Sequence, residues 1–193
     1  MYGETKLKNE KYIKREFLHS KTKYCILRFF NVCGADKKNK IGEFHNPETH
    51  ILPLIVNKMI KGEKLYVYGN NYKTKDGTCI RDYVHVKDIV SGIAKSIIYL
   101  SKGKSDIFNF GSERGLSVSE LISFCEKKLR LNSIVKYKQR RFGDRSKLIC
   151  NFTKAKKILN WKPKYSSLTR IVNDEIWWSK FLILKKYKRK FIY

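Results

Sequence analysis

Acidic residues are scarce in this sequence, which contains 17 Asp and Glu against 43 Lys and Arg. The resulting formal net charge of +26 at pH 7 indicates attraction to phosphate-rich partners, nucleic acid among them. Evolutionary drift that accumulates lysine on the protein surface produces the same charge without any such function. Lysines occur in nearly every polar segment instead of forming one patch, and this scatter favours drift over a nucleic-acid site.

Long apolar runs are also lacking. No stretch reaches the roughly 20 apolar residues that cross a membrane, and no signal-peptide core is present, so we expect no membrane partner. The five cysteines are odd in number and fit no metal-binding spacing, which predicts reduced thiols, a cytoplasmic protein and no metal site. No RNP motif, zinc finger or helix-turn-helix pattern occurs, so we expect no specific nucleic-acid partner.

The most informative stretch runs from Leu65 to Asp88. It begins with an alternating strand, residues 65–68, which ends at Gly69 because glycine and the asparagines after it tolerate positive φ. Residues 79–84 resume an extended pattern that contains Arg81. An arginine and two tyrosines held between turns and strands are suited to a flat, anionic ligand.

A second strand, residues 24–30, is apolar without alternation. Such a run is typical of a strand buried on both faces of a parallel sheet. Ligands bind beyond the carboxyl ends of strands in open α/β sheets, which puts Asn31 where a ligand would lie. A simple turn from Asn31 to Gly34 explains these residues equally well.

The remaining segments alternate between helices and strands. Residues 35–49 predict a long polar loop, and the helix after it begins near Asn46, with Pro53 in its first turn. His50 near this helix start, taken alone, is best explained as a solvated loop histidine. The sequence predicts further helices at 88–100, 117–125, 153–159 and 168–181, and further strands at 107–110 and 133–137.

Tyr2 and Lys6 lie four residues apart in a charged helical segment that extends to about Leu18, so they share a helix face. An ammonium group beside a phenol favours the phenolate form. Such a tyrosine can exchange a proton with a substrate hydroxyl. The spacing alone is weak evidence, because Tyr83 and Lys87 share it.

Several segments together resemble, in order and spacing, the C-terminal part of UDP-glucose 4-epimerases, which are extended short-chain dehydrogenases/reductases of the NAD-dependent epimerase/dehydratase family. The resemblance covers Tyr2 to about Trp178. The segments are Tyr2-Gly-Glu-Thr-Lys6, Leu27-Arg-Phe-Phe-Asn31, Pro47-Glu-Thr-His-Ile-Leu-Pro53, Leu65-Tyr-Val-Tyr-Gly-Asn70, Asp76-Gly-Thr-Cys-Ile-Arg-Asp-Tyr-Val-His-Val-Lys-Asp88, Asn109-Phe-Gly111, Arg140-Arg-Phe-Gly-Asp144 and Leu159-Asn-Trp-Lys-Pro163.

The resemblance implies NAD as cofactor and a UDP-hexose as substrate. The implied reaction is reversible oxidation at C4 through a 4-keto sugar, which interconverts UDP-galactose and UDP-glucose in galactose metabolism. It assigns catalysis to Tyr2 with Lys6, and cofactor contacts to Tyr2, Lys6 and Phe30. The implied substrate residues are Phe29, Asn31, Thr49, His50, Ile51, Leu65, Tyr66, Tyr68, Arg81, Arg141, Asp144 and Leu148.

Within that set, the resemblance places Tyr68 on the uracil and Asp144 on the uridine ribose. It places Arg81 and Arg141 on the pyrophosphate, as suits bidentate guanidinium–phosphate pairing. Leu148 matches a position that affects tolerance for N-acetylated sugars, and its intermediate size leaves that preference open.

The expected fold is α/β: the C-terminal portion of an extended Rossmann-type doubly wound fold, with its last parallel strands and a mixed α/β substrate-binding domain. We expect residues 1–34 to be a remnant of the NAD-binding domain and residues 35–181 to be mainly the substrate domain, with Rossmann segments near 79–111. Residues 182–193 are expected to form a basic tail. A Gly-rich strand–turn–helix for a dinucleotide is not found in the sequence, so we expect the N-terminal NAD-binding half to be missing.

These expectations describe a truncated epimerase that is inactive by itself and forms a homodimer when complete. The alternatives are a nucleotide-sugar binding module without catalysis and a related NAD-dependent sugar epimerase or dehydratase. On charge alone, a basic nucleic-acid-binding protein is a further alternative.

Overall fold

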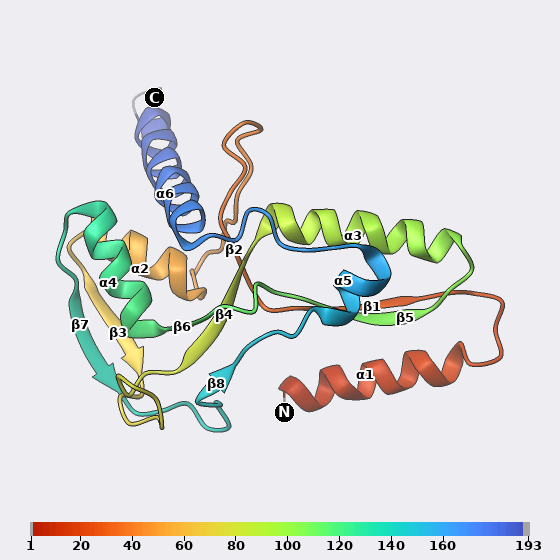
Figure 1. Ribbon diagram of the computed structural model, residues 1–193. Coiled ribbons are helices and arrows are strands. Elements are labelled where there is room, and N and C mark those ends of the chain that lie inside the picture. Colours follow the sequence, from red (N-terminus) through yellow and green to blue (C-terminus); the bar gives the residue numbers. More distant parts are fainter. Residues whose placement is uncertain (1, 191–193) are drawn as a thin grey trace.

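The computed structural model describes the backbone of residues 2–190 and the side chains of residues 3–185. Helices and strands alternate along most of the chain (Figure 1), as expected for an α/β fold. The helices are α1 (Tyr2–Glu16), α2 (Ile51–Ile60), α3 (Val86–Ser101), α4 (Val118–Leu129), α5 (Thr153–Leu159) and α6 (Leu168–Lys190). The strands are β1 (Cys25–Phe29), β2 (Asn31–Cys33), β3 (Lys64–Tyr68), β4 (Ile80–His85), β5 (Asp106–Phe110), β6 (Gly115–Ser117), β7 (Ile134–Lys138) and β8 (Lys147–Leu148). Among these helices, none has the length and apolar character needed to cross a bilayer.

Parallel pairing dominates the sheet topology. Strand β1 pairs with β5, β2 with β4, β3 with β7 and β8 with β4, all in parallel, whereas β6 pairs antiparallel with β4. The β1–β5 ladder makes residues 107–110 a parallel partner of the 24–30 segment. The predicted burial of that segment on both faces is wrong: β1 is half-buried at first and exposed at Arg28 and Phe29, because β5 covers one edge and α3 packs on one face.

Two apolar clusters hold the elements together. One cluster lies where α2, α4 and α6 meet β3, and Leu65 and Leu121 are among its buried members. The other cluster surrounds Phe108 and Phe110 of β5, between α3 and α5. The Trp161 ring meets the Phe110 ring edge-on, with centroids 4.7 Å apart. Cys33, at the carboxyl end of β2, belongs to the first cluster, whereas Phe29, at the carboxyl end of β1, belongs to neither.

Three boundaries differ from the expectations. Residues 31–33 form β2 and not a turn, because residues 83–85 of β4 offer them a parallel ladder. Helix α2 begins at Ile51, with His50 as its extended N-cap residue. Helix α6 continues beyond Phe181 through Lys190, since the leucines and lysines that follow are good helix formers. The segment expected to be a tail is therefore helical as far as it is described.

A buried carboxylate ties β4 to distant parts of the chain. Asp82 is fully buried and accepts hydrogen bonds from the backbone N–H groups of Ser112, Glu113 and Cys150 and from the Ser112 hydroxyl, at 2.6–3.0 Å. These bonds satisfy polar groups that burial would otherwise leave unpaired. They fix the loop after β5 and the segment after β8 against the same strand.

Candidate functional site

A cavity of about 1220 Å³ lies at the carboxyl ends of β1 and β2. In open α/β sheets, this is the edge at which ligands bind. The loop of residues 35–50, the start of α2 and the start of α3 supply its other walls. Six of the predicted site residues line the cavity, namely Phe29, Phe30, Asn31, His50, Ile51 and Leu148.

A row of stacked aromatic and basic side chains borders strand β3. The alternation of the strand buries Leu65 and Val67 and turns Tyr66 and Tyr68 outward. The Arg141 guanidinium lies 4.3 Å from the centre of the Tyr68 ring, and Lys138 lies 4.1 Å from that of Tyr66. Aromatic faces beside guanidinium groups suit planar, negatively charged ligands.

Leu65 needs a correction as a candidate ligand contact. Its side chain is 3% exposed and belongs to the apolar core. The parity of the strand is the cause, because successive side chains point to opposite faces. Only the main chain of Leu65 is therefore left to meet a ligand.

Arg81 and Asp144 form an ion pair between β4 and the loop after β7. The Tyr72 hydroxyl donates to the other Asp144 oxygen at 3.2 Å, and burial together with the Asp144 charge raises the pKa of Tyr72. Arg81 lies inside β4 and not in a turn. Its partner across the β4–β8 ladder is Leu148, which also lines the cavity. This ladder makes the Arg81 cluster a neighbour of the cavity wall.

Helix α1 runs back alongside β1 in the opposite direction (Figure 1). The Arg28 Nε donates to Glu10 Oε1 at 2.7 Å and lowers the pKa of that carboxyl group. Lys6 precedes Glu10 by about one helical turn, or about 6 Å along the axis, and because α1 runs opposite to β1 it lies toward the carboxyl end of that strand. Lys6 is exposed. The Tyr2 side chain lies outside the described residues.

Thr49 does not line the cavity; its backbone N–H donates to Glu48 Oε1 at 2.8 Å. The structure adds cavity residues that sequence patterns missed, among them Tyr83. Burial raises the pKa of Tyr83 well above its usual value, and its hydroxyl has no hydrogen-bond partner among the described residues. Only the Tyr83/Lys87 spacing drew attention to Tyr83, and the strand conformation of β4 separates those two residues.

The chain is similar in sequence to proteins of a known family. The model of the NAD dependent epimerase/dehydratase family matches residues 1–111. The UDP-glucose 4-epimerase of Rhizobium meliloti (strain 1021) is 39% identical over 166 residues, which are 85% of this chain and 51% of the relative. That of Halalkalibacterium halodurans is 39% identical over 181 residues, which are 93% of this chain and 54% of the relative.

Solved structures of UDP-glucose 4-epimerases also have a fold similar to that of this chain. The crystal structure of UDP-glucose-4-epimerase from Stenotrophomonas maltophila, with bound NAD and formylated UDP-arabinopyranose, matches with a TM-score of 0.88 at 29% identity and covers 95% of this chain and 56% of that chain. The enzyme from Bifidobacterium longum, in complex with NAD+ and UDP, gives a TM-score of 0.87 at 28% identity, with coverage of 93% and 54%. The chain spans about half the length of these relatives. Because the family model matches more than half of this chain, the chain belongs to the NAD dependent epimerase/dehydratase family.

Proposed function

We propose that this chain is the substrate-binding, C-terminal half of a UDP-glucose 4-epimerase, and that the complete enzyme interconverts UDP-galactose and UDP-glucose. One observation carries the proposal. Residues far apart in sequence, Asn31, His50 and Leu148, line one cavity, and Arg81 of the Arg81–Asp144 pair is the ladder partner of Leu148. The relatives with this arrangement of segments are UDP-glucose 4-epimerases.

The stacked cluster would bind the UDP moiety. Tyr68 offers a ring face to the uracil, and this face is now covered by Arg141. Entry of the base would displace that guanidinium toward the pyrophosphate, where Arg81 would meet it. Each charge-assisted hydrogen bond to a phosphate contributes about 1.5–3 kcal/mol. Asp144 would then accept from the ribose hydroxyls, with Tyr66 beside the base.

The cavity would hold the hexose. Its volume of about 1220 Å³ exceeds the roughly 300–1,000 Å³ typical of a pocket for one small ligand. The sugar and the reactive end of a cofactor would therefore fit together. Asn31, His50 and Ile51 contribute to its wall, with Thr49 beside them in the chain, and Phe29 closes one side.

The described residues fit only one end of NAD. Tyr2, Lys6 and Phe30 would lie at the nicotinamide end, since the start of α1 lies toward the carboxyl end of β1. A Gly-rich turn for the dinucleotide phosphates is not found between any strand and helix of the described part; β4, for example, passes directly into α3 at Val86. NAD, when bound to the complete enzyme, would accept and return the hydride of C4.

The residues of this chain would transfer the proton and leave space for the sugar to rotate. Tyr2 would take the proton of the C4 hydroxyl group and later return it, acting as general base and then as general acid. Lys6 would stabilise the phenolate. The volume of the cavity would let the 4-keto sugar turn over, so that the hydride returns to the opposite face of C4.

A chimera tests this function. Residues 1–193 would be joined to the N-terminal half of the Rhizobium meliloti relative, and conversion of UDP-galactose to UDP-glucose would be assayed. We expect turnover that Tyr2→Phe abolishes and Tyr12→Phe leaves intact, because Tyr12 is exposed on the same helix. A folded chimera that binds neither UDP nor UDP-galactose would refute the proposal.

A nucleotide-sugar binding module without catalysis is the second candidate. The stacking of the Arg141 guanidinium on the Tyr68 ring supports it, because such a pair suits a nucleotide without any cofactor. In that case the chimera would bind UDP and remain inactive. A related NAD-dependent sugar epimerase or dehydratase would instead act on a different UDP-sugar in the same assay.

A further inference from the structure

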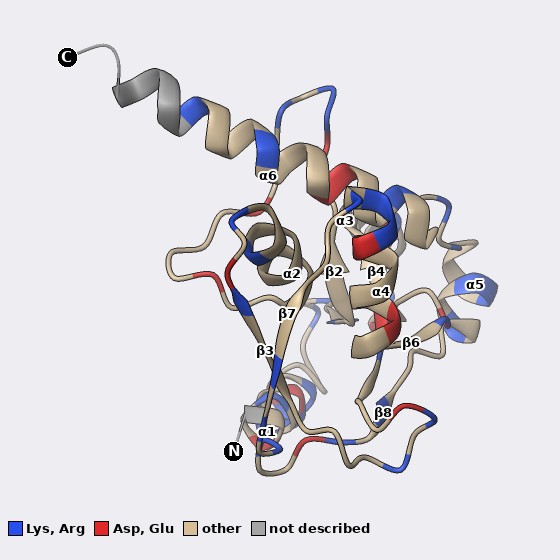
Figure 2. Ribbon diagram, turned by 90° about the vertical axis from the view of Figure 1, so that its left-hand side faces the viewer, with Lys and Arg blue, Asp and Glu red and all other residues tan. Residues whose placement is uncertain are grey.

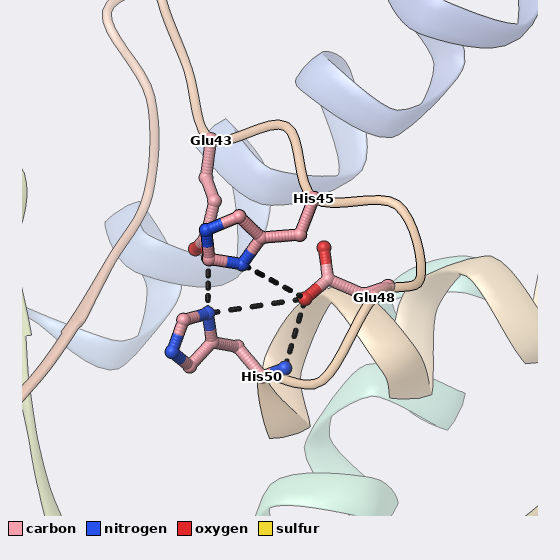
Figure 3. Close-up of side chains that lie close together, drawn as sticks. All are labelled: Glu43, His45, Glu48 and His50. Carbon is pink, nitrogen blue, oxygen red and sulfur yellow. Dashed lines mark hydrogen bonds and ion pairs between the residues drawn. The ribbon is translucent and has the colours of Figure 1, made fainter.

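Two histidines and two glutamates converge in the loop that precedes α2. Glu43, His45, Glu48 and His50 follow the pattern Glu-x-His-x-x-Glu-x-His. One potential ligand atom from each side chain lies within 4.8 Å of the others. Figure 3 shows the four side chains pointing at one another from the two sides of the loop.

The individual contacts define a compact site. His45 Nδ1 lies 3.0 Å from Glu43 Oε1 and 3.9 Å from Glu48 Oε1. His50 Nδ1 lies 3.8 Å from Glu48 Oε1 and also contacts Glu43 Oε1. The two imidazole rings lie side by side, with centroids 4.9 Å apart. Both Nδ1 atoms therefore face the same two carboxylates.

These separations match a tetrahedral set of ligands. Nitrogen and oxygen ligands lie about 2.0–2.2 Å from zinc, so neighbouring ligands of a tetrahedral ion are about 3.4 Å apart. Three of the six separations, at 3.0, 3.8 and 3.9 Å, bracket that value, the contact between His50 and Glu43 is shorter, and none exceeds 4.8 Å. The backbone N–H groups of Thr49 and His50 both donate to Glu48 Oε1 at 2.8 Å, which holds this carboxylate beside the two imidazole rings.

The two glutamates of this cluster are not neutralised by lysine or arginine in the described part of the structure. In a chain with 43 Lys and Arg, neither Glu43 nor Glu48 pairs with one of them in the described part of the structure; their ion-pair partners are His45 and His50. The buried Glu175 of α6 also senses the negative charge of both glutamates. Three acidic groups thus share a region without a basic side chain against the two glutamates.

We propose that Glu43, His45, Glu48 and His50 bind one divalent transition-metal ion of the zinc class. Two carboxylates offset the charge of a dication, and imidazole nitrogens favour zinc, nickel or copper over magnesium and calcium. Four protein ligands close the coordination sphere, so the ion is structural and does not activate water. The cysteine spacing had predicted no metal site, and the Glu/His pattern of this loop was missed.

The ion fixes the loop at the mouth of the cavity. Glu43 and His50 both line the cavity. The Glu43 carbonyl oxygen accepts a hydrogen bond from Trp178 Nε1 of α6, and His50 is the N-cap residue of α2. A bound ion therefore joins the loop to the ends of two helices and shapes the wall in which His50 lies.

Cobalt titration tests the site on the 193-residue chain, which is produced without a polyhistidine tag and kept dilute because of its exposed apolar surface. We expect one Co²⁺ per chain with the intense visible bands of tetrahedral coordination, which Zn²⁺ displaces. His45→Ala and the conservative Glu43→Gln should each lower the affinity for Co²⁺ about tenfold to a hundredfold. His19→Ala, in the exposed segment after α1, should leave affinity unchanged.

Two results would overturn the proposal: equal affinity of His45→Ala and the unchanged chain, or sulfur-to-cobalt charge-transfer bands, which would assign the ion to the five free cysteines. Trypsin gives a second measurement, because Lys37, Lys38 and Lys40 lie in the same loop. Zn²⁺ should slow cleavage there and not at Lys73 and Lys75. Neither experiment contains UDP or NAD, so its failure would not bear on the epimerase function.

Discussion

The imidazole ring of His85 lies directly against the α-carbon of Gly34. A Cβ atom on Gly34 would lie 2.6 Å from both Cδ2 and Nε2 of that ring. His85 is fully buried, its Nδ1 accepts the Lys87 N–H at 3.1 Å, and its Nε2 lies 3.1 Å from Asp174. The ring therefore cannot retreat without losing buried hydrogen bonds.

Gly34→Ala should destabilise the chain by about 3 kcal/mol, because overpacking adds to the strain of a non-glycine residue at positive φ. The φ angle of Gly34 is 83°. Gly62→Ala is the matched control: its φ is 64°, and no described atom lies within 4 Å of the added Cβ. It should cost only about 1 kcal/mol. Denaturant unfolding measures both, and equal losses would contradict the contact.

Glu175 should make stability fall as the pH rises. Burial, followed by the charges of Glu43 and Glu48, raises the pKa of Glu175 from 4.5 to about 7. The folded state then binds more protons than the unfolded state between these values, so the free energy of unfolding decreases through this window by up to about 3 kcal/mol.

Glu175→Gln should remove that loss. In buffer containing a chelator, the variant should be more stable than the unchanged chain at pH 8 by about 2–3 kcal/mol and nearly equal to it below pH 4.5. Glu16→Gln, at the exposed end of α1, should change neither value. A variant that gains no stability at pH 8 would show that the Glu175 carboxyl group is not perturbed.

Arg81→Ala in the chimera should weaken UDP binding about tenfold to a hundredfold, because a charge-assisted contact to phosphate is lost. Isothermal titration measures the change. Arg15→Ala removes the same charge from the far end of α1 and should have no effect. Thermal unfolding of the same variant without UDP separates a loss of binding from a loss of folding, because Asp144 loses its ion-pair partner. Unchanged UDP affinity of the folded Arg81→Ala variant would remove Arg81 from the site.

Binding to random duplex DNA should be weak and should fade at moderate salt, because Lys and Arg occur on most elements and do not form one stripe (Figure 2). Contacts to phosphate alone lose affinity steeply as counterions compete. Fluorescence anisotropy at two salt concentrations measures this. Tight, sequence-selective binding at physiological salt would instead support the nucleic-acid alternative.

The 193-residue chain by itself should bind no NAD, convert no UDP-galactose and be poorly soluble. Phe29 is 46% exposed, and Val90, Ile97 and Ile98 of α3 are each more than half exposed. Such apolar surface beside a strand edge without a partner in the described part promotes association. Equilibrium dialysis with NAD, the coupled epimerase assay and light scattering test the three points. Turnover by pure, soluble chain would contradict the expectation.

Local sequence patterns predicted most helices and strands. The strand pairing and the buried hydrogen bonds depend on contacts between residues far apart in the sequence. The capping box of Ser117 and Glu120 and the alternation of β3 are visible in a few consecutive residues, and both are present. Strand β2 depends on a ladder with residues far along the chain, so its residues looked like a turn. The same holds for Asp82, whose partners lie up to 68 residues away.

The candidate site shows the same division. Motif resemblance identified six cavity residues in advance, whereas the burial of Leu65 followed from the parity of its strand. The pairing of Arg81 with Asp144 and the stacking of Arg141 on Tyr68 depend on where one loop folds back. Neither contact has a sequence signal.

That loop, residues 139–146, connects β7 to β8, and both strands are held by pairing. At one end, Lys138 belongs to the β7–β3 ladder; at the other, β8 pairs with β4 and Cys150 is fastened to the buried Asp82. If Arg141 moves away from Tyr68, the backbone dihedral angles within residues 139–146 must change. Gly143, at φ 75°, is the residue of this loop that tolerates such a change most readily. Movement of the Arg141 side chain can therefore stay within this loop while the strands on either side keep their pairing.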